Sequence, residues 1–166
     1  MSNNVVFEDY SVNVKNLIRE KALVFLREAG EEITSMTVRN QVRKTGQTAG
    51  SWSDSPVLDE GNLAVHMGSN YENAIWEEFG TGEFAEKGNG RKGWWVYIKG
   101  SGGSGSGGKS YSTEGQARRA MAFLRKKGLE AYYTKGKQAR HPFLNAYNSC
   151  KSKIIKRAES IFGELN

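Results

Sequence analysis

Residues 11–35 read SVNVKNLIREKALVFLREAGEEITS and decide the first part of the fold. Ser11 can cap a helix, and charged side chains are interspersed with apolar ones in the residues that follow it. The apolar residues recur every three or four positions and form one stripe: Val14, Ile18, Ala22, Phe25, Ala29 and Ile33. Such a stripe is typical of an amphipathic helix, here from Ser11 to about Ser35. Gly30 is a weak point inside it.

A second long helix is predicted near the other end of the chain. Pro142 suits the first helical turn, where its missing N–H costs nothing. Its apolar stripe again steps by three or four residues: Phe143, Tyr147, Cys150, Ile154, Ala158, Ile161 and Leu165. The sequence therefore places a long amphipathic helix at each end.

Shorter elements are expected between these helices, because runs of alternating or β-branched residues are bounded by Gly, Ser and Asn. In order they are an edge strand at 5–7, a polar, turn-rich stretch at 44–61, a strand at 62–68, a helix at 71–79, a strand at 93–98, a helix at 113–127 capped by Ser112, and a strand at 129–134. The fold class is α+β, with a small, mostly antiparallel sheet packed by the two long helices and shorter connecting helices.

The length and composition predict one globular domain, residues 1–166. Residues 100–108 are only Gly and Ser, so we expect a flexible native loop there. Cys150 is the only cysteine, which excludes an internal disulfide and favours a small buried hydrophobe. Residues 1–4 lack signal-peptide features, and no segment is apolar enough to span a bilayer. We expect synthesis in a cytoplasm and no membrane contact.

The net charge of +6 is unevenly distributed along the chain. Residues 1–86 contain 7 Lys/Arg and 14 Asp/Glu, whereas residues 87–166 contain 17 and 4. Three interpretations remain open: a nucleic-acid footprint, complementary faces on neighbouring copies, or a lopsided solvated surface.

Residues that often carry catalysis do not form a catalytic pattern here. Gly80-Thr81-Gly82 lacks the Lys-Ser/Thr of a phosphate loop, so it is interpreted as a backbone break with positive φ. Glu77, Glu78, Glu83 and Glu86 are clustered, which favours a solvated or partner-facing acidic patch. His66 and His141 have no metal-ligand spacing, so structural, hydrogen-bonded roles are expected for both. The sequence therefore predicts no enzyme, no cofactor and no metal.

Aromatic and basic residues mark the second half of the chain. Alternation puts Trp94 and Trp95 on opposite faces of one strand; the face of Trp95 and Tyr97 could stack bases, pack under a helix or contact another subunit. The helix at 113–127 is basic, either as a solvated face or as a docking surface for an acidic neighbour. The residues predicted at a subunit or partner interface are Glu77, Glu78, Glu83, Trp95, Arg118, Arg119, Arg125 and Lys126.

In order and chemistry these pieces resemble the Hong Kong-type phage gene-ten family of tailed-phage morphogenesis proteins, a group of neck, tail-completion and tail-terminator proteins. The matching parts are the long first helix, Thr45-Gly46 with Ser51-Trp52, the strand ending at Gly68, Tyr71-Glu72-Asn73-Ala74, Glu78-Phe79-Gly80-Thr81-Gly82, Gly93-Trp94-Trp95-Val96-Tyr97, Ala122-Phe123-Leu124-Arg125-Lys126-Lys127-Gly128 and Pro142-Phe143-Leu144. Within them, the structural-motif positions are Gly80, Thr81, Gly82, Trp94, Pro142 and Phe143. One departure is residues 53–57, which are more polar than the strand usual there.

The resemblance implies a non-enzymatic virion protein at the neck or the top of the tail, made in the bacterial host cytoplasm. It would form a homo-oligomeric ring, with a hexamer expected, that completes or terminates the tail tube and docks it to the head connector. Its partners would be other copies, the tail tube protein, and head connector or sheath proteins, with transient contact to phage DNA. A headless phage-derived contractile particle would need a similar ring. The alternative is a nucleic-acid-binding protein that uses the basic second half.

Overall fold

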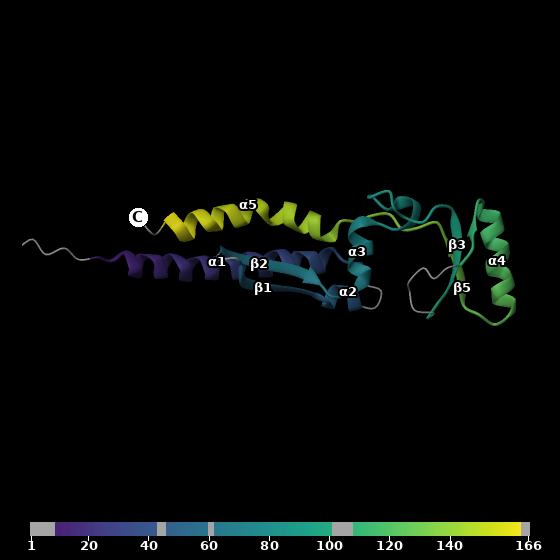
Figure 1. Cartoon of the computed structure of the whole chain (residues 1–166), viewed down its shortest axis with the longest axis horizontal. Helices are drawn as coiled ribbons and strands as arrows, with labels where there is room; N and C mark the ends of the chain where they lie inside the picture. Colours follow the sequence, from purple (N-terminus) through teal and green to yellow (C-terminus); the bar gives the residue numbers. More distant parts are fainter. Residues whose placement is uncertain (1–8, 43–45, 60–61, 101–107, 164–166) are drawn as a thin grey trace, which may run out of the picture. The chain divides into compact units, whose positions relative to one another are not determined.

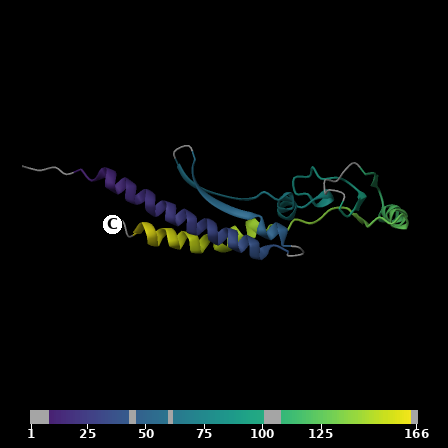
Figure 2. The same cartoon turned by 90° about the horizontal axis from the view of Figure 1, so that it is seen from below.

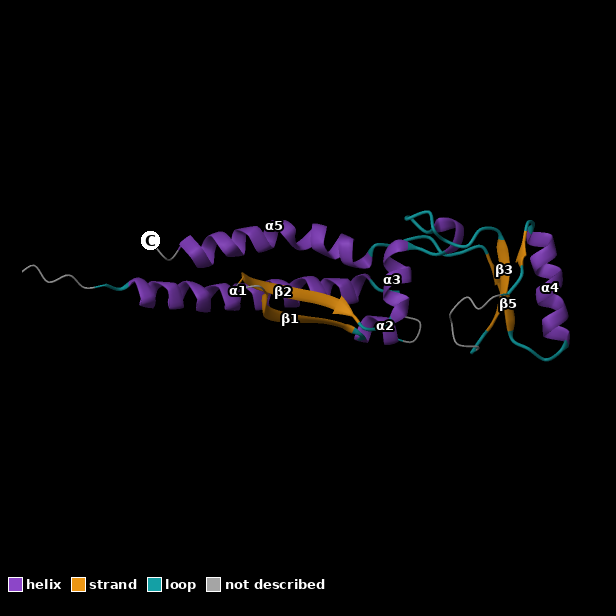
Figure 3. Cartoon of the chain, in the orientation of Figure 1, coloured by secondary structure: helices purple, strands orange, loops and turns teal. Residues whose placement is uncertain are grey.

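The structure is a computed structural model that describes residues 9–42, 46–59, 62–100 and 108–163. Within these residues it contains five α-helices, long at both ends of the chain, and small antiparallel sheets of two and three strands (Figures 1 and 3). The predicted α+β class is therefore confirmed. The strand predicted at 5–7, Leu165 and residues 101–107 of the Gly/Ser segment lie outside the described residues.

The chain divides into two compact units. The helical unit comprises Met1–Asn70 and Phe143–Asn166, and the sheet unit comprises Tyr71–Pro142. The single domain expected from length and composition stays a prediction. The order of helices and strands had predicted one sheet beneath both long helices. Instead the strands belong to two sheets, and both long helices lie in the helical unit.

The helical unit is built on α1 (Ser11–Asn40) and α5 (Pro142–Gly163). A hairpin of β1 (Trp52–Asp59) and β2 (Asn62–Ser69) packs on α1, and α2 (Gln47–Gly50) precedes it. The hairpin lies on one side of α1, and α5 runs along another (Figure 2). Helix α1 is therefore the element that the rest of this unit shares.

Strand β1 corrects the prediction that residues 44–61 are turn-rich. It pairs with β2 over its whole length, from Trp52 opposite Ser69 to Asp59 opposite Asn62. Pro56 is compatible with this strand because each strand of a two-stranded sheet has an unpaired edge. The polar residues 53–57 thus do form the strand that the resemblance implied, held by cross-strand pairing rather than by β-propensity.

Gly30 is a contact point between α1 and the hairpin. A Cβ at this position would lie 2.7 Å from Val65 Cγ2 and 3.2 Å from Asp54 Cβ. The glycine that weakens the helical pattern is therefore the residue that lets the hairpin approach α1 closely.

Helix α1 begins at Ser11, where the sequence predicts it. It ends at Asn40, five residues beyond the predicted end near Ser35. Ser11 is not the cap: Tyr10 occupies that position, and the backbone N–H of Ser11 donates to Asp9 Oδ1 at 2.8 Å. Met36, in the extra turns, packs against the core, so burial rather than capping chemistry extends the helix.

The core of the helical unit joins α1 to α5. Ile33 packs with Ala146 and Cys150, and Phe143 borders this cluster. The Phe143 ring stacks on Trp52 with centroids 5.6 Å apart. Cys150 is 2% exposed, and burial raises the pKa of its thiol. The prediction of a buried, hydrophobe-like cysteine is confirmed.

The sheet unit holds a three-stranded antiparallel sheet with β3 (Trp94–Ile98) between β4 (Ser110–Tyr111) and β5 (Ala131–Thr134). Helix α4 (Glu114–Lys126) packs on it, with Ala117 and Ala131 fully buried. Tyr133, on the same face as Ala131, donates its hydroxyl to Glu114 at 2.9 Å. Helix α4 therefore covers that face of the sheet.

The cap of α4 differs from the prediction by one residue. Thr113, not Ser112, is the cap, and its Oγ1 accepts from the Gln116 backbone N–H at 3.4 Å. Ser112 instead donates to the Gln116 side chain at 3.1 Å.

Candidate subunit interface

The Gly80-Thr81-Gly82 motif holds the sheet unit together. It follows α3 (Glu72–Phe79) and leads into the 3-10 turn η1 (Gly82–Phe84). Thr81 donates its N–H to Lys137 O at 2.8 Å and accepts from the Lys137 N–H at 3.3 Å; Glu83 N–H donates to Lys135 O at 2.9 Å. The motif thus pairs with residues 135–141, which we name the return segment.

Both glycines of this motif have the predicted positive φ, +71° at Gly80 and +62° at Gly82. Gly82 is also crowded: a Cβ would lie 2.4 Å from Lys135 O and 2.5 Å from the Trp95 ring. Only glycine fits this backbone without displacement. The predicted backbone break with positive φ is therefore confirmed. We name residues 80–82, with their backbone hydrogen bonds to the return segment, the latch.

The acidic patch predicted on α3 and η1 has partners inside the chain. Glu77 pairs with Lys137, and Glu83 lies 3.8 Å from Lys135 Nζ. Buried Glu78 lies 4.0 Å from His141 Nδ1. The return segment thus places a basic side chain, Lys137, Lys135 or His141, near each predicted interface carboxylate. Their contact with a neighbouring copy stays a prediction.

His141 belongs to the same cluster, in line with the structural, hydrogen-bonded role predicted for it. It is the one non-glycine residue of the described chain with positive φ, +52°, and its Nε2 lies 2.9 Å from Glu86 Oε1. In the sequence, the alternating Lys135 and Lys137 were the available signal for this arrangement. Their partners, Glu83 and Glu77, lie about 50–60 residues earlier in the chain, so no local pattern identifies them.

Both faces of β3 are partly covered. Trp94 contacts Tyr133 with ring centroids 5.6 Å apart, and Trp95 lies under the Arg91 guanidinium at 5.1 Å. Tyr97 stacks on Tyr132 and stays 47% exposed. Trp95 is therefore half-buried within the unit, and Tyr97 is the aromatic residue of β3 that a partner can reach.

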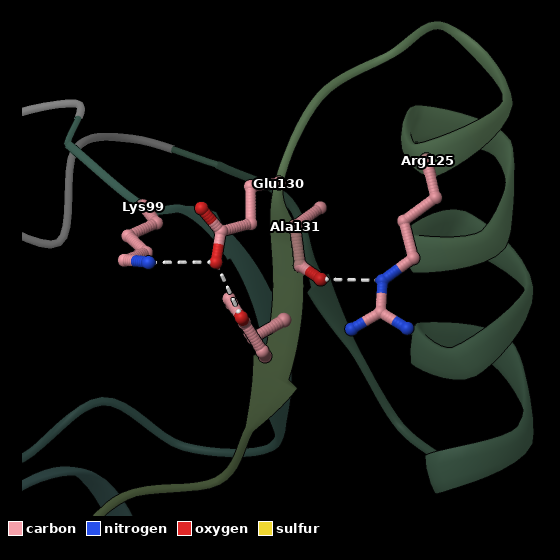
Figure 4. A network of polar contacts seen from close by, with 5 residues as sticks. Lys99, Arg125, Glu130 and Ala131 are labelled. Atoms are coloured by element: carbon pink, nitrogen blue, oxygen red, sulfur yellow. Dashed lines mark hydrogen bonds and ion pairs between the residues drawn. The ribbon is translucent and has the colours of Figure 1, made fainter.

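A polar network closes the exposed end of the sheet (Figure 4). Lys99 and Glu130 form an ion pair at 2.8 Å, which raises the pKa of Lys99 and lowers that of Glu130. Arg125 reaches from α4 to the Ala131 carbonyl at 2.8 Å, and its guanidinium lies over Tyr132. Arg125, a predicted interface residue, thus ties α4 to β5.

The remaining predicted basic residues, Arg118, Arg119 and Lys126, are exposed on α4.

The uneven distribution of charge along the sequence looks different when charges are counted for each structural unit. The helical unit contains 11 Lys/Arg and 11 Asp/Glu, whereas the sheet unit contains 13 and 7, and so carries the whole excess of +6. The acidic and basic halves of the sequence are not the two structural units.

The N-terminal segment of α1, residues 11–20, is exposed at every position. It carries large apolar side chains: Val12 is 66% exposed, Val14 51%, Leu17 46% and Ile18 42%. Val14 and Ile18 belong to the stripe predicted to face the core. The stripe is therefore covered from Ala22 onward but not before it.

A groove of about 690 Å³ runs between α1 and α5. Its floor is apolar, formed by Phe25, Ala29 and Ile154. Ion pairs cross it: Arg157 Nε donates to Glu28 Oε2 at 2.6 Å, and Lys153 lies 2.9 Å from Glu32. The hydrogen bond from Arg157 lowers the pKa of Glu28. The groove thus has an acidic wall on α1 and a basic wall on α5.

In the part of the chain that the structure describes, no group of three or more His, Cys, Asp or Glu side chains could hold a metal ion. None of the described helices combines the length and the apolar character needed to cross a membrane.

No family model matches the chain, and no curated protein or solved structure matches it either.

Proposed function

We propose that this chain is a non-enzymatic structural subunit that assembles with copies of itself into a ring at the neck or the top of a phage tail. There it completes or terminates the tail tube and joins it to the head connector, or caps a headless particle. The observation that carries the proposal is the exposed apolar surface on α1, residues 11–20.

Self-association explains this surface better than an isolated protomer does. Buried hydrophobic residues are mostly small, with Ala29, Ala74, Ala117, Ala131 and Ala146 among them. Four large apolar side chains on ten consecutive residues of α1 stay in water instead. Three of them, Val14, Leu17 and Ile18, share one face of the helix, and adjacent exposed apolar side chains of this kind mark protein interaction sites.

The test is native mass spectrometry of the intact protein, with negative-stain imaging in the presence of tail tubes. We expect a closed oligomer that binds tube ends. The double variant Val14→Asp/Leu17→Asp should shift the population to monomers, since it places two charges in the buried contact. Phe123→Asp, at a 58% exposed residue of α4, is the matched control and should still assemble. A wild-type protein that remains monomeric at high concentration and does not bind tubes would reject the proposal.

Nucleic-acid binding is the second candidate, and the charge of the sheet unit favours it. Its excess of +6 includes three exposed basic residues on one helix, Arg118, Arg119 and Lys126. Contacts to phosphates make affinity strongly salt-dependent. Gel retardation should weaken by more than about tenfold between about 50 and 200 mM salt.

The variant Arg119→Glu/Lys126→Glu should abolish this retardation. Lys151→Glu, an equally exposed position on α5, is the control that should retain it. Absence of any retardation at low salt removes this candidate and leaves the first proposal intact.

A further inference from the structure

From the groove and the exposed helix segment, which rest on the proposed self-assembly, we infer that residues 11–20 of α1 in one copy dock into the α1–α5 groove of a neighbouring copy. Within the described chain, both surfaces belong to the helical unit. Each has an apolar centre between charged flanks.

The two surfaces match in length. Residues 11–20 form about 15 Å of helix at 1.5 Å per residue. The groove is lined by α1 residues from Phe25 to Ser35, which also span about 15 Å. The docked segment would therefore match the length of the groove and lie over the ion pairs that cross it.

The charges also match. At 100° per residue, Lys15 and Arg19 lie on one flank of the stripe formed by Val14, Leu17 and Ile18, and Glu20 lies on the other flank. A docked segment thus carries a basic edge and an acidic edge. The groove offers the complement, acidic residues on α1 and basic residues on α5.

Unused charges remain available in the groove for this contact. Within the described residues, Glu31 on the acidic wall and Lys156 on the basic wall make no ion pair, unlike Glu28 and Glu32. Lys15 and Arg19 likewise make none there, and both are exposed. Docking would pair the basic edge with Glu31 and the acidic edge with Lys156, while Val14, Leu17 and Ile18 cover Phe25, Ala29 and Ile154.

Mixed disulfide cross-linking tests the contact on the full chain. One preparation carries Val14→Cys, and a second carries Ser35→Cys or Ser160→Cys, residues of α1 and α5 that line the groove. After mixing under mild oxidation, we expect a covalent heterodimer with one of the two groove variants; which of them reacts gives the direction of the docked helix. Ser152→Cys, exposed on α5 outside the groove lining, is the matched control and should not cross-link.

Charge reversal provides a second readout. Lys15→Glu/Arg19→Glu should weaken oligomerisation at least about tenfold, and adding Glu31→Lys should restore part of it. Oligomers that persist in native mass spectrometry with no cross-link to either groove position overturn this inference and leave the proposed function standing. A wild-type protein that forms no oligomers would reject the proposed function itself.

Discussion

The helical unit and the sheet unit differ in their net charge and in how their charged side chains are paired. The helical unit contains equal numbers of acidic and basic residues, and two ion pairs, Lys153–Glu32 and Arg157–Glu28, cross from α5 to α1. The sheet unit pairs its carboxylates with the return segment and still keeps the whole positive excess. Opposite charges separated along the sequence are therefore brought together within each unit.

The same comparison separates two kinds of exposed surface. The helical unit exposes apolar side chains on α1, suited to a contact that excludes water. The sheet unit exposes basic side chains on α4, suited to an acidic or phosphate-bearing surface. One chain thus presents two chemically distinct kinds of exposed surface, and the proposed ring subunit would use them for different neighbours.

The largest expected effect is at the latch of the sheet unit. Gly82→Ala combines a positive φ with an overlap against Lys135 O, so it should destabilise this unit by roughly 3 kcal/mol or more. Hydrogen exchange should show faster exchange in β3 and β5, with α1 and α5 unchanged. Gly88→Ala, with a similar φ but open space around it, should cost only about 1 kcal/mol. Equal effects of the two variants would show that crowding at the latch is unimportant.

A smaller effect is expected where the hairpin meets α1. Gly30→Ala improves helix propensity but drives a methyl group against Val65, so the net loss of unfolding free energy should be about 1–2 kcal/mol. Gly115→Ala in α4, with nothing within 4 Å, is the control and should instead stabilise by up to about 1 kcal/mol. Chemical denaturation measures both changes. The same sign for both variants would contradict the close approach at Gly30.

The cap of α4 predicts a still smaller difference. Thr113→Ala should lower the stability of the sheet unit by about 0.5–1 kcal/mol, because the Gln116 N–H loses its acceptor. Ser112→Ala should cost less, since its hydroxyl bonds a side chain rather than the helix backbone. Thermal unfolding of both variants compares them, and a larger loss in Ser112→Ala would place the cap where the sequence predicted it.

The smallest effect concerns the ion pair across the groove. Because Arg157 lowers the pKa of Glu28 below its ordinary 4.5, the pair contributes fully above that pH. Its contribution is lost as the pH falls through the lowered value in the folded protein. A carbon-detected NMR titration of the Glu28 carboxyl should show this low pKa, and Arg157→Gln should return it toward 4.5. An unchanged pKa of Glu28 in that variant would contradict the hydrogen bond between Arg157 and Glu28.

Sequence patterns predicted the elements that depend on local chemistry. Helix α5 starts at Pro142, and α3 ends at Phe79 with Gly80 as its C-cap, in line with the φ preferences of Pro142 and Gly80. Strand β1 was missed because its residues are polar and its stability comes from pairing with β2. The exposure of Val14 was also missed, since a periodic stripe does not reveal where its cover ends.

What the sequence determined by itself is the α+β class, the two long amphipathic helices and the backbone break at Gly80, because each depends on side chains within a few residues of one another. Only the tertiary structure decided which charges pair, why Gly30 must lack a side chain and how much of the α1 stripe stays exposed. Glu77 meets Lys137 sixty residues away, and Glu28 meets Arg157 at a separation of 129. Contacts of that span depend on how the chain returns on itself, which local periodicity does not encode.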